Sequence, residues 1–380
     1  MKKVMSLLFV TFSCLLLNSC EYKNETNSSL VISEVVEGSG NNRAVELYNI
    51  SNEEISLDKY SLEIQLLSKI ETVVLSGNVK PNETFVIVFD GANDELKSKA
   101  NLISDSLKFN GTQPILLKKG KKILDIVGVY ENQVDYCKDI SLVRKKEYFS
   151  PRKTFDEYDW IRYSTDNYKY LGSINPSVTN SELLEGPKLT EEYLNAPYYI
   201  EQPNGTFLGG GGVMDVKVKS YIDGDTTSFY YDEEILKVIG VQQGVKLRYQ
   251  NIDTPESYVG NIQEFGLKAK EYTKSRLSSA FEIQIQSILN GNLTETFDRM
   301  LGWVWIDGEL LNHSIVKMGY SDVAFDNGNH MYYKDISYSS YLYNAQLYAI
   351  KMKKGKHGEK DPYWDYENNR VKDDSYGNMK

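Results

Sequence analysis

The sequence predicts a mostly β protein of two domains: a β-sandwich, followed by an α+β domain built on a five-stranded barrel of the OB type. Three observations lead to this prediction. The chain has 380 residues, which exceeds one ordinary domain. Short alternating strands separated by turn signals fill its first half, whereas strands mixed with helical patterns fill its second half. Tyrosine, at 29 copies against 13 Phe and 4 Trp, suits half-buried strands and wet surfaces outside the cell.

The N-terminus has the pattern of an export signal over residues 1–19. A basic start at Met1–Lys3 precedes an apolar run, Val4–Leu17, which is shorter than the roughly 20 residues that span a bilayer. The run ends in Leu17-Asn18-Ser19-Cys20 and then turns polar, which resembles a bacterial lipobox. The resemblance implies a lipid on Cys20, a flexible tether over 20–28 and a location on the outer face of the bacterial cell membrane. A plain signal peptide cleaved elsewhere is the alternative.

Cysteine usage agrees with this interpretation. The three cysteines are Cys14, Cys20 and Cys137. Cleavage removes the first and acylation occupies the second, so Cys137 has no partner for an intrachain disulfide. Domains of this size have enough core to fold without one, and we expect Cys137 to pack as a small apolar residue.

A β-sandwich is predicted over residues 29–180. Short alternating runs separated by turn signals are typical of its strands, and they lie at 30–36, 44–49, 60–67, 72–75, 84–89 and 114–118. The pattern I-S-E-V at 32–35, a glycine turn and V-E-L-Y-N at 45–49 resemble the lamin tail domain, which implies an immunoglobulin-like sandwich. The segment shows no metal cluster and no nucleophile–base spacing, so we expect a non-catalytic spacer or a module that binds a surface ligand.

Residues 181–212 are predicted to link the two domains. They contain Pro187, Pro197 and Pro203 and end in the run Gly209–Gly212. Four consecutive glycines lose much conformational entropy when they are held in one conformation, so we expect a flexible boundary here.

The second domain is predicted at 213–360, followed by a polar tail at 361–380. Its five expected strands lie at 216–222, 228–231, 245–252, 282–289 and 301–306. Helical patterns lie at 265–280, 310–318 and 339–352. Five strands with three helices suit a small barrel of the OB type.

Acidic and basic side chains gather near the ends of these strands. Asp225 sits at one strand end, and Asp253 and Glu256 lie just past another. Carboxylates that meet repel unless a cation joins them, and oxygen ligands without nearby His or Cys favour Ca²⁺ or Mg²⁺ over Zn²⁺. Arg248 and Arg299 beside such a centre suit a phosphodiester, whose charge rises in the transition state. Arg248 and Asp253 are five residues apart, so they reach one site only if the chain twists or bends between them.

Each feature also has an ordinary explanation. Asp223-Gly224 and Asp307-Gly308 are common hairpin turns. Thr254-Pro255-Glu256 is a favourable helix start, and Arg299 would serve as a surface charge. Short motifs recur by chance, so these gain weight only together.

Three motifs in order resemble staphylococcal nuclease. They are I-D-G-D-T at 222–226, R-Y-Q-N-I-D-T-P-E at 248–256 and F-D-R-M-L-G-W-V-W-I-D-G-E-L-L-N at 297–312. The resemblance implies a calcium-dependent enzyme that hydrolyses DNA, and RNA as a further substrate, to 3′-phosphate products.

The resemblance also implies a role for each matching residue. Asp225 and Asp253 would ligate Ca²⁺ through their carboxylates, and Thr254 through its backbone carbonyl. Glu256 would act on the attacking water, as general base or as its positioner. The two arginines named above would clamp the phosphate and stabilise its added negative charge.

Two departures from the family bear on substrate binding. Phe297-Asp298 stand where the family has Tyr-Gly before the second arginine, so the site loses a hydroxyl and gains a negative charge. Phe325 and Asn327 match two family tyrosines that stack on nucleotides, and only Phe325 can still stack. We expect Phe297 and Phe325 to contact substrate, while every catalytic position is kept.

The competing interpretation is an adaptor or adhesin lipoprotein whose barrel kept its fold and binds nucleic acid or a surface ligand without catalysis. The net charge is −10, and residues 213–360 carry 17 Lys and Arg against 19 Asp and Glu. This balance excludes a tight, static DNA binder but not an enzyme that releases its product. The retained acids and arginines favour the enzyme.

Overall fold

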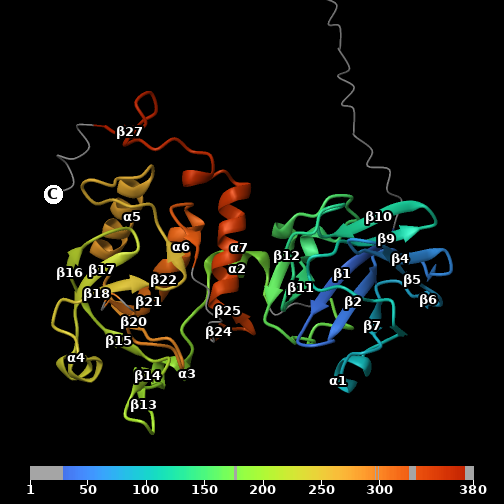
Figure 1. Cartoon of the computed structure of the whole chain (residues 1–380), viewed down its shortest axis with the longest axis horizontal. Helices are drawn as coiled ribbons and strands as arrows, with labels where there is room; N and C mark the ends of the chain where they lie inside the picture. Colours follow the sequence, from blue (N-terminus) through green and yellow to red (C-terminus); the bar gives the residue numbers. More distant parts are fainter. Residues whose placement is uncertain (1–28, 175–177, 296, 298, 325–330, 373–380) are drawn as a thin grey trace, which may run out of the picture.

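The computed structural model describes residues 29–372, apart from 175–177, 296, 298 and 325–330. It shows two β-rich domains side by side, with helix α7 (Tyr338–Lys351) of the second domain facing the first (Figure 1). The expected predominance of strands, with a sandwich before a barrel, is confirmed. Cys20 and the predicted export signal lie outside the described residues. Within the described part, no helix is both long and apolar enough to cross a bilayer.

The first domain is a sandwich of two sheets. The larger sheet, in the order β12-β11-β1-β2-β7-β8, contains β1 (Leu30–Glu37), β2 (Arg43–Asn49), β7 (Thr84–Phe89), β8 (Leu102–Ser104), β11 (Ile140–Arg144) and β12 (Trp160–Tyr163). The smaller sheet, in the order β10-β9-β4-β5, contains β4 (Tyr60–Gln65), β5 (Ile70–Val74), β9 (Ile115–Lys119) and β10 (Lys122–Val127). Apolar side chains of both sheets form the core, in which Cys137 is buried as expected.

Strand β1 is buried along its whole length because both of its faces are covered. Its outer face lies in a second apolar cluster with Leu96 of the short helix α1 (Asp94–Lys97) and with Leu171. This cover also encloses Glu34 and its cross-strand neighbour Glu46. Short elements complete the domain: β3 (Ile55–Ser56), β6 (Asn78–Val79), η1 (Lys146–Tyr148) and η2 (Glu157–Asp159).

The segment predicted as a flexible linker is folded. It contains α2 (Asn180–Glu185), α3 (Glu191–Asn195) and a hairpin of β13 (Tyr199–Glu201) and β14 (Phe207–Gly209). The glycine run that follows is buried, and a Cβ on Gly209, Gly210 or Gly212 would lie 2.1, 2.1 or 2.0 Å from a backbone carbonyl oxygen. The expectation of flexibility is wrong because these glycines permit close backbone packing instead of loose motion.

The second domain is a strongly curved sheet in the order β15-β20-β21-β18-β17-β16. Its strands are β15 (Val213–Asp215), β16 (Lys217–Tyr221), β17 (Thr226–Tyr230), β18 (Lys246–Tyr249), β20 (Ile283–Gln286) and β21 (Met300–Ile306), and β22 (Glu309–Leu310) pairs with β21. Five of these correspond to the predicted strands. The core packs Trp303 and Trp305 of β21 edge-on against Tyr338 of α7, with ring centroids 5.3 and 5.8 Å apart.

The three predicted helices are present as α5 (Gly266–Ser279), α6 (Leu311–Lys317) and α7. A further helix, α4 (Glu233–Ile239), lies between β17 and β18 and was not predicted. Its signals are in the sequence, since Asp232 caps the backbone N–H of Glu234 and Gly240 ends the helix at φ 76°. Short pairs complete the domain: β19 (Ile252–Asp253) with β23 (Asp322–Val323), and β24 (Tyr332–Tyr333) with β25 (Ile336–Ser337).

The predicted polar tail is folded as far as the structure describes it, to Lys372. The short helix η3 (Gly355–His357) lies just before it. The tail itself forms a hairpin of β26 (Trp364–Asp365) and β27 (Arg370–Val371). Asp361 is buried and accepts a hydrogen bond of 2.6 Å from the backbone N–H of Phe265, next to the start of α5. A buried carboxylate that satisfies a helix-end N–H anchors this segment, which composition alone did not indicate.

Candidate active site

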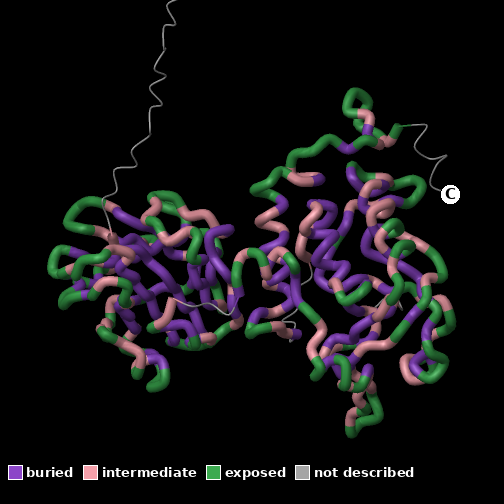
Figure 2. Tube along the Cα trace, turned by 180° about the vertical axis from the view of Figure 1, so that it is seen from behind, coloured by how far each residue is buried: buried purple, intermediate pink, exposed green. Residues whose placement is uncertain are grey.

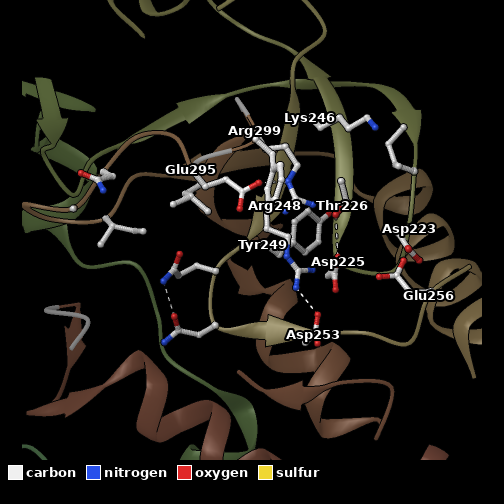
Figure 3. A pocket seen from close by; sticks show the side chains of 18 of the residues that line it. Asp223, Asp225, Thr226, Lys246, Arg248, Tyr249, Asp253, Glu256, Glu295 and Arg299 are labelled. Carbon is white, nitrogen blue, oxygen red and sulfur yellow. Dashed lines mark hydrogen bonds and ion pairs between the residues drawn. The ribbon is translucent and has the colours of Figure 1, made fainter. Parts of the chain in front are cut away.

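A pocket of about 980 Å³ opens at the ends of the barrel strands (Figure 3). Its wall consists of the turn before β17, strand β18 with the segment after it, and the loop between β20 and β21. The charged side chains that line it are Asp223, Asp225, Lys246, Arg248, Asp253, Glu256, Glu295 and Arg299. The structure therefore brings together all five acids and arginines that the sequence nominated, from three separate motifs.

Asp225 lies at the floor of this pocket and is almost fully buried. Its Oδ2 accepts hydrogen bonds from the backbone N–H and the hydroxyl of Thr254, at 2.7 and 3.0 Å, and its Oδ1 accepts one from Thr226 at 2.9 Å. Glycine at 224 permits this approach, because a Cβ there would lie 2.8 Å from both Thr254 Oγ1 and Ala269 of α5. These bonds hold the carboxylate in one orientation and tie the first motif to the second.

Arg248 and Asp253 meet because the chain bends between them. Asn251 has a left-handed backbone with φ 57°, which ends β18 and turns the chain into β19. The guanidinium of Arg248 therefore reaches both carboxylates: Nη2 lies 2.6 Å from Asp253 Oδ1, and Nη1 forms an ion pair with Asp225. Burial lowers the pKa of Arg248, but the two carboxylates outweigh it and raise the pKa above its usual value. The bend that the sequence argument required is thus at Asn251.

Glu256 lies at the edge of the pocket beside Asp223, which the sequence argument had treated as a turn residue. Asp223 accepts a hydrogen bond of 2.8 Å from the N–H of Gly224 and shares a hydrogen bond with Glu256. Burial raises the pKa of both carboxyls, and the charge of Asp223 raises the pKa of Glu256 further. A carboxylate whose pKa is moved towards neutrality is better suited to accept a proton from water.

Arg299 lies just before β21, the strand that pairs with β18, and lines the same pocket. Its guanidinium forms an ion pair with Glu295 and lies 5.8 Å from the ring centre of Phe297. Phe297 is 78% exposed and lines the same pocket, so it presents a free aromatic face there. Phe325, the other residue predicted to contact substrate, lies outside the described residues, as do Asn327 and Asp298.

Two further residues that line the pocket were not predicted from the sequence. Lys246 lies two positions before Arg248 on β18, so both side chains project from the same face of the strand, and it is exposed. Tyr258 is 55% exposed at the end of the second motif. Strand alternation would have identified the lysine, whereas nothing in the sequence marks this tyrosine among the 29.

The donor set of the pocket fits a hard divalent cation. Among the described residues, no three side chains of His, Cys, Asp or Glu converge on one point. Two carboxylates, of Asp225 and Asp253, do converge, and the structure places the cationic guanidinium of Arg248 against both. A Ca²⁺ or Mg²⁺ ion held there would complete its shell with the Thr254 carbonyl and water, which are also oxygen donors.

Comparison with known protein families places two of them on this chain. A model of the staphylococcal nuclease homologues matches residues 246–355, and a model of the lamin tail domain matches residues 23–131. The nuclease match begins at Lys246 and so excludes Asp225, although the structure joins both in one site. The lamin tail match ends before β11 and β12, although both strands belong to the larger sheet of the sandwich.

Individual proteins resemble the second domain. The thermonuclease of Staphylococcus hyicus is 30% identical over 149 residues, which are 39% of this chain and 78% of that protein. Two proteins of Bacillus subtilis (strain 168) are each 28% identical over 115 residues, or 30% of this chain: the SPbeta prophage-derived endonuclease YokF, of which 35% is covered, and the endonuclease YncB, of which 49% is covered. The chain thus spans less than half of either Bacillus protein.

Proposed function

Because the chain belongs to the staphylococcal nuclease family of phosphodiester hydrolases, we propose that it is a calcium-dependent extracellular nuclease. Its substrates would be DNA and RNA, cleaved to 3′-phosphate products. The observation that carries the proposal is the convergence of Asp225, Arg248 and Asp253 in a pocket that Glu256 and Arg299 also line.

The arginines give the pocket its affinity for a phosphodiester. Arg248 and Arg299 come from the neighbouring strands β18 and β21 and line one pocket, so a phosphate bound there would receive charge-assisted hydrogen bonds from both. Both guanidinium groups are held by acids, Arg248 by Asp225 and Asp253 and Arg299 by Glu295, and are therefore oriented before substrate arrives. A Ca²⁺ ion, when bound, would add positive charge at the phosphate and offset the two carboxylates.

Glu256 supplies the base in this proposal. It would accept a proton from the attacking water, or orient that water through its second oxygen. Asp223 is placed to assist, because its carboxyl lies beside that of Glu256 and its charge raises the pKa of this base. The extra negative charge that develops on the phosphate would be stabilised by the two arginines, which are already fixed in place.

The location follows from the sequence pattern and remains part of the proposal. A lipid on Cys20 would hold the protein on the outer face of the cell membrane, and residues 20–28 would act as a tether. The sandwich would then lie nearest the membrane and could bind a surface ligand. Mass spectrometry of the mature N-terminus tests this directly: an unmodified residue other than Cys20 would refute acylation.

The decisive experiment is nuclease activity of the purified chain on single- and double-stranded DNA and on RNA. It is measured with Ca²⁺, with Mg²⁺ and with a chelator, for the wild type, Glu256→Gln and Arg299→Ala. Glu282→Gln, an exposed acid of the same domain outside the pocket, is the matched control. We expect activity that requires Ca²⁺ and falls by about 10²–10³ in both site variants while the control is unchanged. A folded protein that binds DNA and cleaves nothing would support the adaptor instead.

A further inference from the structure

The turn that brings Arg248 to Asp253 is supported by a side chain from another part of the chain. Asn251, which is 2% exposed, donates a hydrogen bond of 2.6 Å from Nδ2 to Ser339 Oγ on helix α7. Its Oδ1 accepts a bond of 2.6 Å from Gln250. A left-handed backbone is unfavourable for residues other than glycine, and asparagine tolerates it best when its side chain is hydrogen-bonded. The two contacts therefore stabilise the turn conformation on which the ion pair depends.

Helix α7 makes a second bond to the same region. The side chain of Gln346 accepts a hydrogen bond of 2.6 Å from the backbone N–H of Val323 in β23. Strand β23 pairs with β19, so that Asp322 lies opposite Asp253. One helix thus bonds to the turn before Asp253 and to the strand beside it. A displacement of α7 would therefore be transmitted to Asp253 through both hydrogen bonds.

Another side of α7 is bound by the sandwich (Figure 1). Tyr341 is fully buried in an apolar cluster with side chains of β11 and β12. Tyr343 donates a hydrogen bond to Glu157, and Arg162 of β12 lies over its ring at 4.2 Å. Lys351 pairs with Asp156 at 3.0 Å. The helix is therefore packed between the two domains, and the tube view shows little exposure along it (Figure 2).

We propose that Asn251 is a positioning residue for Arg248 and Asp253, and that the sandwich domain, by holding α7, keeps this residue in its working conformation. The sandwich is then a structural part of the phosphodiester site and not only a spacer. The geometric half of this inference, that α7 and Asn251 hold Arg248 and Asp253 in place, stands on the contacts above. Its catalytic half, that this placement matters for hydrolysis, rests on the proposed function.

Hydrogen–deuterium exchange of the whole chain, read by mass spectrometry over residues 248–256, tests the geometric half without any substrate. Ser339→Ala removes the bond to Asn251, and Tyr343→Phe removes one interface bond without opening a cavity. The controls on the same helix are Ser340→Ala, which keeps the helix cap, and Ile350→Ala, whose side chain is exposed. We expect exchange in this segment to accelerate by roughly 3- to 10-fold in Ser339→Ala, and measurably in Tyr343→Phe, because a lost hydrogen bond frees the turn. Unchanged exchange in both variants would overturn the proposal.

Steady-state kinetics test the catalytic half. Asn251→Gly keeps the left-handed backbone but loses the side-chain bonds, whereas Asn251→Ala loses both. We expect kcat to fall in both variants, more in the alanine variant, with KM changed little because Asn251, at 2% exposed, offers a substrate almost no surface. Equal kcat in wild type and both variants would sink the positioning role. A wild type without nuclease activity, combined with the expected exchange pattern, would instead reject the proposed function and leave the structural coupling intact.

Discussion

The buried carboxyl pair of the sandwich makes stability depend on pH in a direction that can be calculated. Glu46 is 1% exposed, and burial raises its pKa from 4.5 to about 7, against the opposing effect of hydrogen bonds from Ser33 and Gly172. Its neighbour Glu34 is fully buried, and neither of its side-chain oxygens has a hydrogen-bond partner among the described residues. A raised carboxyl pKa means that the folded state prefers the protonated form.

The direction and the size of this pH effect on stability follow from the linkage between proton binding and folding. The preference for the proton stabilises the fold fully below pH 4.5, and this contribution is lost as the pH rises through about 7. Raising the pKa from 4.5 to about 7 corresponds to about 3 kcal/mol, since one pKa unit is worth about 1.36 kcal/mol. Glu46→Gln cannot ionise, but its amide keeps only one of the two hydrogen bonds of 2.7 and 2.6 Å, which costs about 1 kcal/mol.

The difference in stability between Glu46→Gln and wild type should therefore change sign with pH. We expect Glu46→Gln to be less stable than wild type by about 1 kcal/mol at pH 4 and more stable by about 2 kcal/mol at pH 8. Urea unfolding of the whole chain at both pH values, followed by a probe of the sandwich, measures the difference. The exposed Glu54→Gln is the control and should stay within about 0.5 kcal/mol at both pH values. A Glu46→Gln variant that is equally destabilised at pH 4 and pH 8 would refute the reasoning.

Three further predictions concern the second domain, and a fourth concerns the segment before it. Arg248→Lys should lower kcat by about 10²-fold, because an ammonium cannot bridge both carboxylates as the guanidinium does; a metal-binding titration of the same variant separates lost catalysis from lost ion affinity. Phe297→Ala should raise KM for single-stranded DNA at least several-fold with kcat nearly unchanged, as expected for loss of a stacking surface. Lys246→Gln should weaken substrate binding and flatten its dependence on salt, whereas equal salt slopes would exclude a phosphate contact. Gly210→Ala should destabilise the fold by about 2 kcal/mol or more in urea unfolding, because its Cβ would lie 2.1 Å from the carbonyl oxygen of Pro197.

The site was predictable from sequence where its residues occur in short, ordered motifs. Asp225, Asp253 and Glu256 could be named because oxygen ligands at strand ends repeat a known chemical pattern, and the structure brings them to one pocket. Asp223 was missed because an Asp-Gly pair is more often a turn, and only the fold shows that its carboxyl meets Glu256. The role of Asn251 could not be predicted from the sequence, because its hydrogen-bond partner Ser339 is 88 residues away along the chain.

The fold was predictable at the level of strands and less so for the connections. Hydrophobic periodicity located the barrel strands and helices α5, α6 and α7 within a few residues, but not α4. The glycine run was misjudged because glycine signals either freedom or close packing, and composition does not distinguish them. Polar composition predicts a tail after residue 360, yet one buried aspartate is enough to anchor residues 361–372.

Strand β12 stands at one edge of the larger sheet, and it is covered by α7 and β25 from the far end of the sequence. During synthesis the sandwich emerges first, so this edge and the apolar side chains beside it stay open until the last part of the second domain has followed. An uncovered edge strand invites pairing with another chain. Loss of the C-terminal helix by truncation or proteolysis would therefore leave the sandwich prone to aggregate, even though every one of its own strands is intact.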